Sequence, residues 1–386
     1  MNKQNKLQKA LLWIIVVLVS AIIIIVGSKK TTKNIDFFKY DANVTEHAVV
    51  TSVGKKTIHE RSQGTDVTTK DYEIAFKCKI LSGKHKDEIV NAVQTKSSNY
   101  ALTAKVKIVE NGDRVLLTDS GGWQFVDYYR LDKIGILAII FAIGLIIIGL
   151  KKGINALISL TFTALFVFCV FLPWIMNGYN IYLGILLTCT FTIVMTLLLI
   201  EGATKKSLVT MLGCFAGTGM AALVTYISNI FLHLTGMTDE HSIYITMLFP
   251  DKPIDLVALV FSGIIIGALG AIMDVAMDIS SSLNEIVIHV PDIKFTELFR
   301  SGMRIGRDIM GTMSNTLILA YIGSSVTDIM LLITYSSSIV ELANREVIIA
   351  DMLQALAGSM AILLTVPFTI VLAGIVYLGK RRIKKA

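Results

Sequence analysis

The sequence has 386 residues, of which 54% are apolar and only 17% are charged. Soluble domains contain about 25% charged residues, so this composition excludes an ordinary soluble enzyme and indicates a membrane protein. The formal net charge is +7, but the basic residues lie largely at the borders of apolar runs, which argues against nucleic acid as a partner.

The first predicted element is a cytoplasmic tail followed by a membrane anchor helix, residues 1–28. Lys3, Lys6 and Lys9 precede an apolar run, Leu11–Gly27, and a signal peptide has the same order of charge and hydrophobicity. We expect a retained helix, because no cleavage site of small residues follows and the run is long for the core of a signal peptide.

Residues 29–133 form the only large polar segment and predict a β-rich, extracytoplasmic domain between the first and second spans. Alternating or β-branched runs are separated by turn residues at Ser82-Gly83 and Asn111-Gly112-Asp113. Such runs predict a small barrel of about five or six antiparallel strands. The runs are 48–53, 72–80, 89–93, 106–109 and 114–117.

The polar segment contains no pattern of a metal site or a catalytic nucleophile. Cys78 is the only cysteine in the segment, so an intradomain disulfide is excluded. Its histidines are scattered and are interpreted as ordinary surface residues: His47, His59 and His85. Binding or gating is therefore favoured over catalysis for this domain.

Residues 134–386 predict a seven-helix transmembrane domain, which makes about eight transmembrane helices in all. Each run is close to the length needed to cross a hydrocarbon core of about 30 Å. Besides 11–28, the predicted spans are 134–150, 154–172, 181–200, 207–232, 254–276, 309–333 and 359–379. Glu201, ahead of Lys205 and Lys206, is interpreted as a charge at a membrane border.

The distribution of basic residues predicts the orientation of these spans. With a cytoplasmic N-terminus, the inner segments carry 16 Lys/Arg, including the connection 277–308 and the basic C-terminus. The short outer loops carry only two, Lys252 and Arg345. Positive charge accumulates on the cytoplasmic side, so both termini are predicted to be cytoplasmic.

Small and acidic residues share one face of the sixth predicted span. At 100° per residue, Gly263, Gly267, Gly270, Asp274 and Asp278 project in similar directions if the helix continues past the membrane border. Glycines at this spacing let a neighbouring helix backbone approach closely. Carboxylates are costly in or near the bilayer, so they are expected to face protein or water.

The seventh span begins with a second polar face, on which Asp308, Thr312 and Asn315 follow at helical spacing. Together with Asp274 and Asp278, these residues predict a site just inside the cytoplasmic leaflet. Hard oxygen ligands suit Na⁺, Mg²⁺ or a proton. No other cofactor is expected. The alternative interpretation is structural: the carboxylates lie in water among the head groups, and Asn315 joins two helices.

The runs Gly267–Glu285 and Gly302–Gly323 resemble the YibE/F family of bacterial multi-pass membrane proteins. The outer segment and the span after Arg130 resemble the longer, YibE-type members. The resemblance implies a location in the bacterial plasma membrane and a shorter YibF-type paralogue as a partner in a hetero-oligomer. It implies no substrate and no reaction.

Two functions compete at this point, and neither is enzymatic. The first is a transporter or channel whose cation or proton site is the acidic face. The second is a membrane-anchored scaffold or accessory protein whose outer domain, 29–133, binds an envelope or exported partner. A hydrolase with paired aspartates is disfavoured, because Arg307 would keep its neighbour Asp308 ionised.

Overall fold

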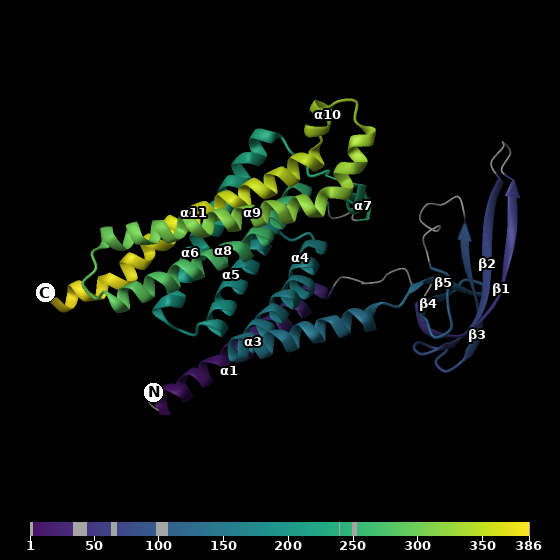
Figure 1. Cartoon of the computed structure of the whole chain (residues 1–386), viewed down its shortest axis with the longest axis horizontal. Helices are drawn as coiled ribbons and strands as arrows, with labels where there is room; N and C mark the ends of the chain where they lie inside the picture. Colours follow the sequence, from purple (N-terminus) through teal and green to yellow (C-terminus); the bar gives the residue numbers. More distant parts are fainter. Residues whose placement is uncertain are drawn as a thin grey trace. The chain divides into compact units, whose positions relative to one another are not determined.

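The computed structural model describes residues 3–33, 45–62, 68–97, 107–238, 240–248 and 253–385. The chain divides into two compact units, Asp36–Ile147 and the combination of Met1–Ile35 with Ile148–Ala386. The structure is mostly helical, with a small barrel in the part of the chain that follows the first helix (Figure 1).

The barrel confirms the prediction of a small β-rich domain in the polar segment. Its five strands form a closed barrel in the order β1-β2-β3-β5-β4. One pairing differs from the expected antiparallel pattern, because β3 and β5 run parallel through Ala92–Trp123 and Val93–Gln124. The strands are β1 (Thr45–Ser62), β2 (Thr68–Ile80), β3 (Ile89–Ser97), β4 (Arg114–Asp119) and β5 (Trp123–Tyr128).

One predicted strand of the barrel is not a strand. Val106 lies outside the described residues, and Lys107–Val109 form no ladder. The buried side chain of Gln94 holds this segment instead: its amide donates to the Lys107 carbonyl at 3.0 Å and its carbonyl accepts from the Val109 N–H at 3.0 Å. The side chain thus supplies the partners that a neighbouring strand would supply.

Two histidines of the barrel have specific contacts, contrary to the expectation of ordinary surface residues. The ring of His47 stacks on Tyr129 at 3.9 Å, and burial together with the positive charge of Arg114 lowers the pKa of His47. His85 Nδ1 lies 3.0 Å from the Glu46 carboxylate, which is almost fully buried. The side chain of His59 lies outside the described part of the structure. Both histidines are therefore held by neighbouring side chains of the barrel, His47 by Tyr129 and His85 by Glu46.

Cys78 lies in the core of the barrel, and burial raises the pKa of its thiol to about 11. A free cysteine has a pKa near 8.5 and reacts as the thiolate. In the folded chain, a variant with Cys78 as its single cysteine should react with a maleimide at least about 100-fold more slowly than an exposed thiol at pH 8. The rate is measured by mass spectrometry.

The control for this labelling is a variant in which Cys78 is also replaced by alanine and the exposed Lys86 is replaced by cysteine. Its only thiol then lies at position 86. Denaturant should bring the two labelling rates together, because unfolding exposes Cys78. Rapid native-state labelling of Cys78 would contradict its place in the core.

Seven helical segments of the described chain are long and apolar enough to cross a membrane, in agreement with the predicted helical class. The expected number was eight. The spans predicted at 134–150 and 154–172 fall within one continuous segment, Leu131–Met176. The helices are α1 (Lys3–Thr32), α3 (Leu131–Phe166), the π-helix η2 (Val167–Phe171), α4 (Leu172–Met176), α5 (Ile181–Ile200), α6 (Lys205–Leu232), α7 (Glu240–Leu248), α8 (Leu256–His289), α9 (Phe295–Tyr335), α10 (Ile339–Ala343) and α11 (Glu346–Lys385).

A break at Leu150 explains the difference in number. Leu150 has φ 49° and ψ −126°, which is not helical, so α3 consists of two helical parts. The segment has 46 residues, and a straight helix of that length would be about 69 Å long, more than twice a hydrocarbon core. A positive φ is uncommon for a leucine, and here it separates the two helical parts of α3.

Helices α6, α8, α9 and α11 lie side by side and form most of the helical core (Figure 1). Glycines permit the close approaches. The Cβ position of Gly217 on α6 meets Thr365 of α11, and that of Gly306 on α9 meets Val366 of α11. Helix α11 passes through Pro367 without ending. It is therefore the central helix against which α6 and α9 pack.

The connection expected at 277–308 is mostly helical. Helix α8 continues to His289 and α9 begins at Phe295, so only a short turn separates them. The acidic residues of the predicted face therefore lie on regular helix along their whole length.

Candidate functional site

The predicted face of α8 is exposed in the described chain. Asp274 and Asp278 are exposed, whereas their neighbours Val275, Ala276 and Ile279 are fully buried. The exposed face also includes Gly263, Gly267, Gly270 and Glu285. One side of α8 thus packs in the core, and the other presents small residues and carboxylates.

The second set of predicted residues lies on an exposed face of α9. Asp308, Thr312 and Asn315 are exposed, and the Thr312 hydroxyl donates to the Ile309 carbonyl at 2.9 Å. The opposite side of α9 is fixed by Gly302 and Gly306, which are buried against α11. Packing on α11 therefore orients the polar face of α9 away from that helix.

The structure brings Asp274 and Asp278 together but does not join them directly to the α9 residues. They lie four residues apart on α8, so their side chains share one face of the helix. Among the residues that the structure describes, no hydrogen bond or ion pair links either carboxylate to Asp308, and no group of three or more His, Cys, Asp or Glu side chains could hold a metal ion. The arrangement offers two separate oxygen-rich faces.

Sequence reasoning missed two polar side chains that contact the α8 face. At Gly267, a Cβ atom would lie 2.5 Å from the hydroxyl of Tyr321 on α9 and 3.3 Å from the amide nitrogen of Gln354 on α11. Gly263 and Gly270 have nothing within 4 Å of their Cβ positions in the described chain. A polar residue on one helix that lies opposite a glycine on another would have indicated these contacts. The sequence alone does not show which helices face each other.

A polar junction lies where α5 ends and α6 begins. Glu201 forms an ion pair with Lys206 at 2.8 Å, and their side chains are only 12% and 21% exposed. The Lys206 carbonyl accepts from Ser280 of α8 at 3.1 Å, and the Ser280 and Tyr377 hydroxyls are 2.8 Å apart. Glu201 is thus part of a mostly buried polar network that joins α5, α6, α8 and α11.

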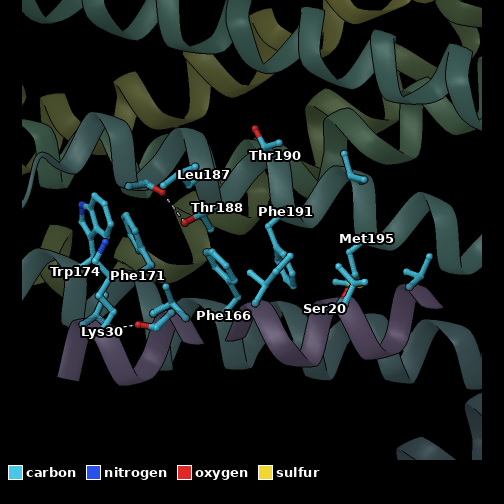
Figure 2. A pocket seen from close by; sticks show the side chains of 18 of the residues that line it. Ser20, Lys30, Phe166, Phe171, Trp174, Leu187, Thr188, Thr190, Phe191 and Met195 are labelled. Carbon is cyan, nitrogen blue, oxygen red and sulfur yellow. Dashed lines mark hydrogen bonds between the residues drawn. The ribbon is translucent and has the colours of Figure 1, made fainter. Parts of the chain in front are cut away.

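A cavity of about 600 Å³ lies between α1, α5 and the segment from Phe166 to Trp174 (Figure 2). Its lining is almost entirely apolar, and no carboxylate lines it. The apolar lining of the cavity therefore differs chemically from the acidic faces of α8 and α9.

The comparisons with known proteins identify the helical part of the chain. The family model described as YibE/F-like protein matches residues 137–379, which include both acidic faces and more than half of the sequence. No curated protein matches the chain, and no solved structure matches it. The chain therefore belongs to the YibE/F-like protein family.

Proposed function

We propose that the chain is an integral protein of the bacterial plasma membrane that crosses the bilayer eight times. Seven long apolar helices support this placement, and the break at Leu150 would divide the segment Leu131–Met176 into two crossings. The concentration of Lys/Arg in one set of connections supports a cytoplasmic location for both termini. The barrel is then extracytoplasmic.

Within this placement, we propose a transporter or channel with a proton- or cation-linked site on α8 and α9. The observation that carries the proposal is the exposed pair Asp274 and Asp278 on a helix otherwise apolar enough to span a membrane. An insertion penalty of roughly 2.5–3.5 kcal/mol per carboxylate at the bilayer centre, and less near its edge, disfavours contact with lipid. Water in a pathway or a further protein surface must cover this face.

The neighbouring groups fit a pathway for a hard ion. Asp308, Thr312 and Asn315 provide further oxygen atoms on α9, and such atoms suit a proton or a hard cation. Tyr321 and Gln354 extend the polar character of the α8 face at Gly267. Polar groups therefore follow the same face of α8 over several helical turns.

The proposal is tested with purified full-length protein in liposomes, with an entrapped pH-sensitive dye under a proton gradient and, separately, with an entrapped Na⁺-sensitive dye under a Na⁺ gradient. Asp274→Asn is expected to reduce the wild-type flux at least about tenfold, because an amide neither ionises nor binds a proton. Asp308→Asn is expected to reduce the flux as well. Initial rates of dye response measure both effects.

Asp255→Asn is the matched control at the opposite end of α8. Asp255 caps the helix by accepting from the Ala258 N–H at 3.0 Å, and asparagine caps a helix about equally well, so this variant should keep the wild-type flux. Unchanged flux in both Asp274→Asn and Asp308→Asn would contradict the proposed site.

The barrel favours a second candidate function, that of a membrane-anchored scaffold. It has a closed strand order and a core of its own within a separate compact unit, so it could bind an envelope partner without any transport. Absence of proton and Na⁺ flux in the wild-type protein would favour this second function.

A further inference from the structure

The cavity beside α1 runs along the helix from Ile15 to Thr31 (Figure 2). That distance is about 24 Å at the rise of an α-helix, most of the thickness of a hydrocarbon core. The volume of about 600 Å³ lies within the range of roughly 300–1,000 Å³ for small-molecule sites. The cavity is therefore long, narrow and large enough for an extended apolar chain.

Polar contacts attach α1 to the neighbouring helices near both ends of the cavity. Near one end, Trp13 Nε1 donates to Asn155 at 2.9 Å, and Asn155 donates to the Leu199 carbonyl at 2.8 Å. Near the other end, the Asn177 amide donates to the Thr31 carbonyl. These contacts fix the separation of the cavity walls.

Apolar side chains close the walls between these two attachments. Phe166 stacks on Phe191 at 4.3 Å, and Ile24 packs against Phe166 and Val170. An apolar cavity does not retain ordered water, because water needs two or more polar partners. Within a bilayer, the available apolar occupant is a lipid acyl chain.

The two ends of the cavity differ in charge. Lys30 and Trp174 lie at one end, while Ser20 and Met195 lie toward the other (Figure 2). Among the described residues, the Lys30 ammonium group has no ion-pair partner. Trp174 donates to the Asn180 carbonyl at 2.9 Å and lies 5.0 Å from the Tyr179 ring, and such aromatic residues are typical of a membrane interface.

We propose that this cavity binds one acyl chain of an anionic glycerophospholipid, with the head-group phosphate at Lys30. A cation at the interfacial end of an apolar slot matches the charge and shape of this lipid. The inference rests on the proposed membrane placement and is independent of the proposed transport site. The acyl chain would fill the cavity and thereby contact both α1 and α5.

The test uses full-length protein with equal amounts of dioleoylphosphatidylglycerol and dioleoylphosphatidylcholine, and native mass spectrometry counts the bound lipid. The wild-type protein should retain the anionic lipid preferentially. Lys30→Ala should reduce that preference about fivefold, which is the equivalent of about 1 kcal/mol for one basic side chain near a membrane surface. Lys29→Ala, one residue away and outside the cavity lining, should keep the preference.

Two further variants separate the cavity from general surface attraction. Val194→Trp fills the cavity and should remove the bound lipid, whereas Leu186→Trp places the same ring at an exposed position outside the lining. If Val194→Trp does not fold, Ile23→Trp fills the cavity from the α1 side. Monodisperse elution and helical circular dichroism establish folding.

Three results would overturn the proposal. One is equal retention of the two lipids by the wild-type protein. Another is equal loss of preference in Lys30→Ala and Lys29→Ala, which would indicate diffuse attraction. The third is a bound polypeptide mass, in place of lipid, that disappears in Val194→Trp.

Discussion

Replacing Gly217 with leucine is expected to separate α6 from α11 and to destabilise the helical core by about 3 kcal/mol or more. The Cβ position of Gly217 meets the Thr365 hydroxyl and lies 2.8 Å from Ile272 Cγ2. Neither neighbour can move freely, because Thr365 is fully buried and donates to the Ala361 carbonyl at 2.7 Å. Thermal unfolding in detergent, followed by circular dichroism, measures the effect.

Gly219→Leu is the matched control, with the same substitution two residues away on α6. Nothing lies within 4 Å of the Gly219 Cβ position in the described chain, and leucine has a higher helix propensity than glycine by somewhat less than about 1 kcal/mol. This variant should therefore be as stable as the wild type or slightly more stable. Similar losses in both variants would show that the contact with Thr365 is not the cause.

The sequence predicts the helices and most strands because their patterns are local. The predicted spans 207–232 and 254–276 correspond to α6 and to the first part of α8, and the turn at Asn111-Gly112 has the left-handed φ of 87° that favours glycine. The strand β5 was missed, although the alternation of Trp123 and Phe125 after two glycines was a usable signal. Local periodicity therefore predicts the elements well.

The pairing of helices could not be predicted in the same way. Glycines at helical spacing occur in α6, α8 and α9, and each set predicts a close approach equally well. In the structure, Gly217 and Gly306 pack on α11, while Gly263 and Gly270 remain uncovered in the described chain. The choice depends on which helices are neighbours in space, and a single sequence does not contain that information.

The arrangement of the candidate site could also be predicted only in part from the sequence. Helical spacing places Asp274 and Asp278 on one face and Asp308, Thr312 and Asn315 on another. The relation between the two faces depends on the packing of α8 and α9 against α11. The contacts of Tyr321 and Gln354 at Gly267 come from residues 54 and 87 positions away in the sequence, beyond the reach of any local pattern.

Glu201→Gln is expected to destabilise the chain by about 3 kcal/mol, because it leaves the Lys206 ammonium group mostly buried without a counter-ion. The destabilisation should also affect α8 and α11, beyond the turn between α5 and α6. The Lys206 carbonyl also accepts from Ser280 of α8, and Ser280 bonds to Tyr377 of α11. Thermal unfolding of the purified full-length protein measures the change.

The double variant Glu201→Gln, Lys206→Gln separates the charge effect from the loss of a contact. Removing both charges should recover most of the lost stability, since two neutral amides are much less costly to bury than one unpaired ammonium group. Tyr377→Phe should cost only about 1 kcal/mol, because Ser280 still donates to the Lys206 carbonyl. A double variant no more stable than Glu201→Gln alone would contradict an ion-pair origin. The network would then act through the shape of the turn, and Glu201→Asp should be as destabilising as Glu201→Gln, although it keeps the charge.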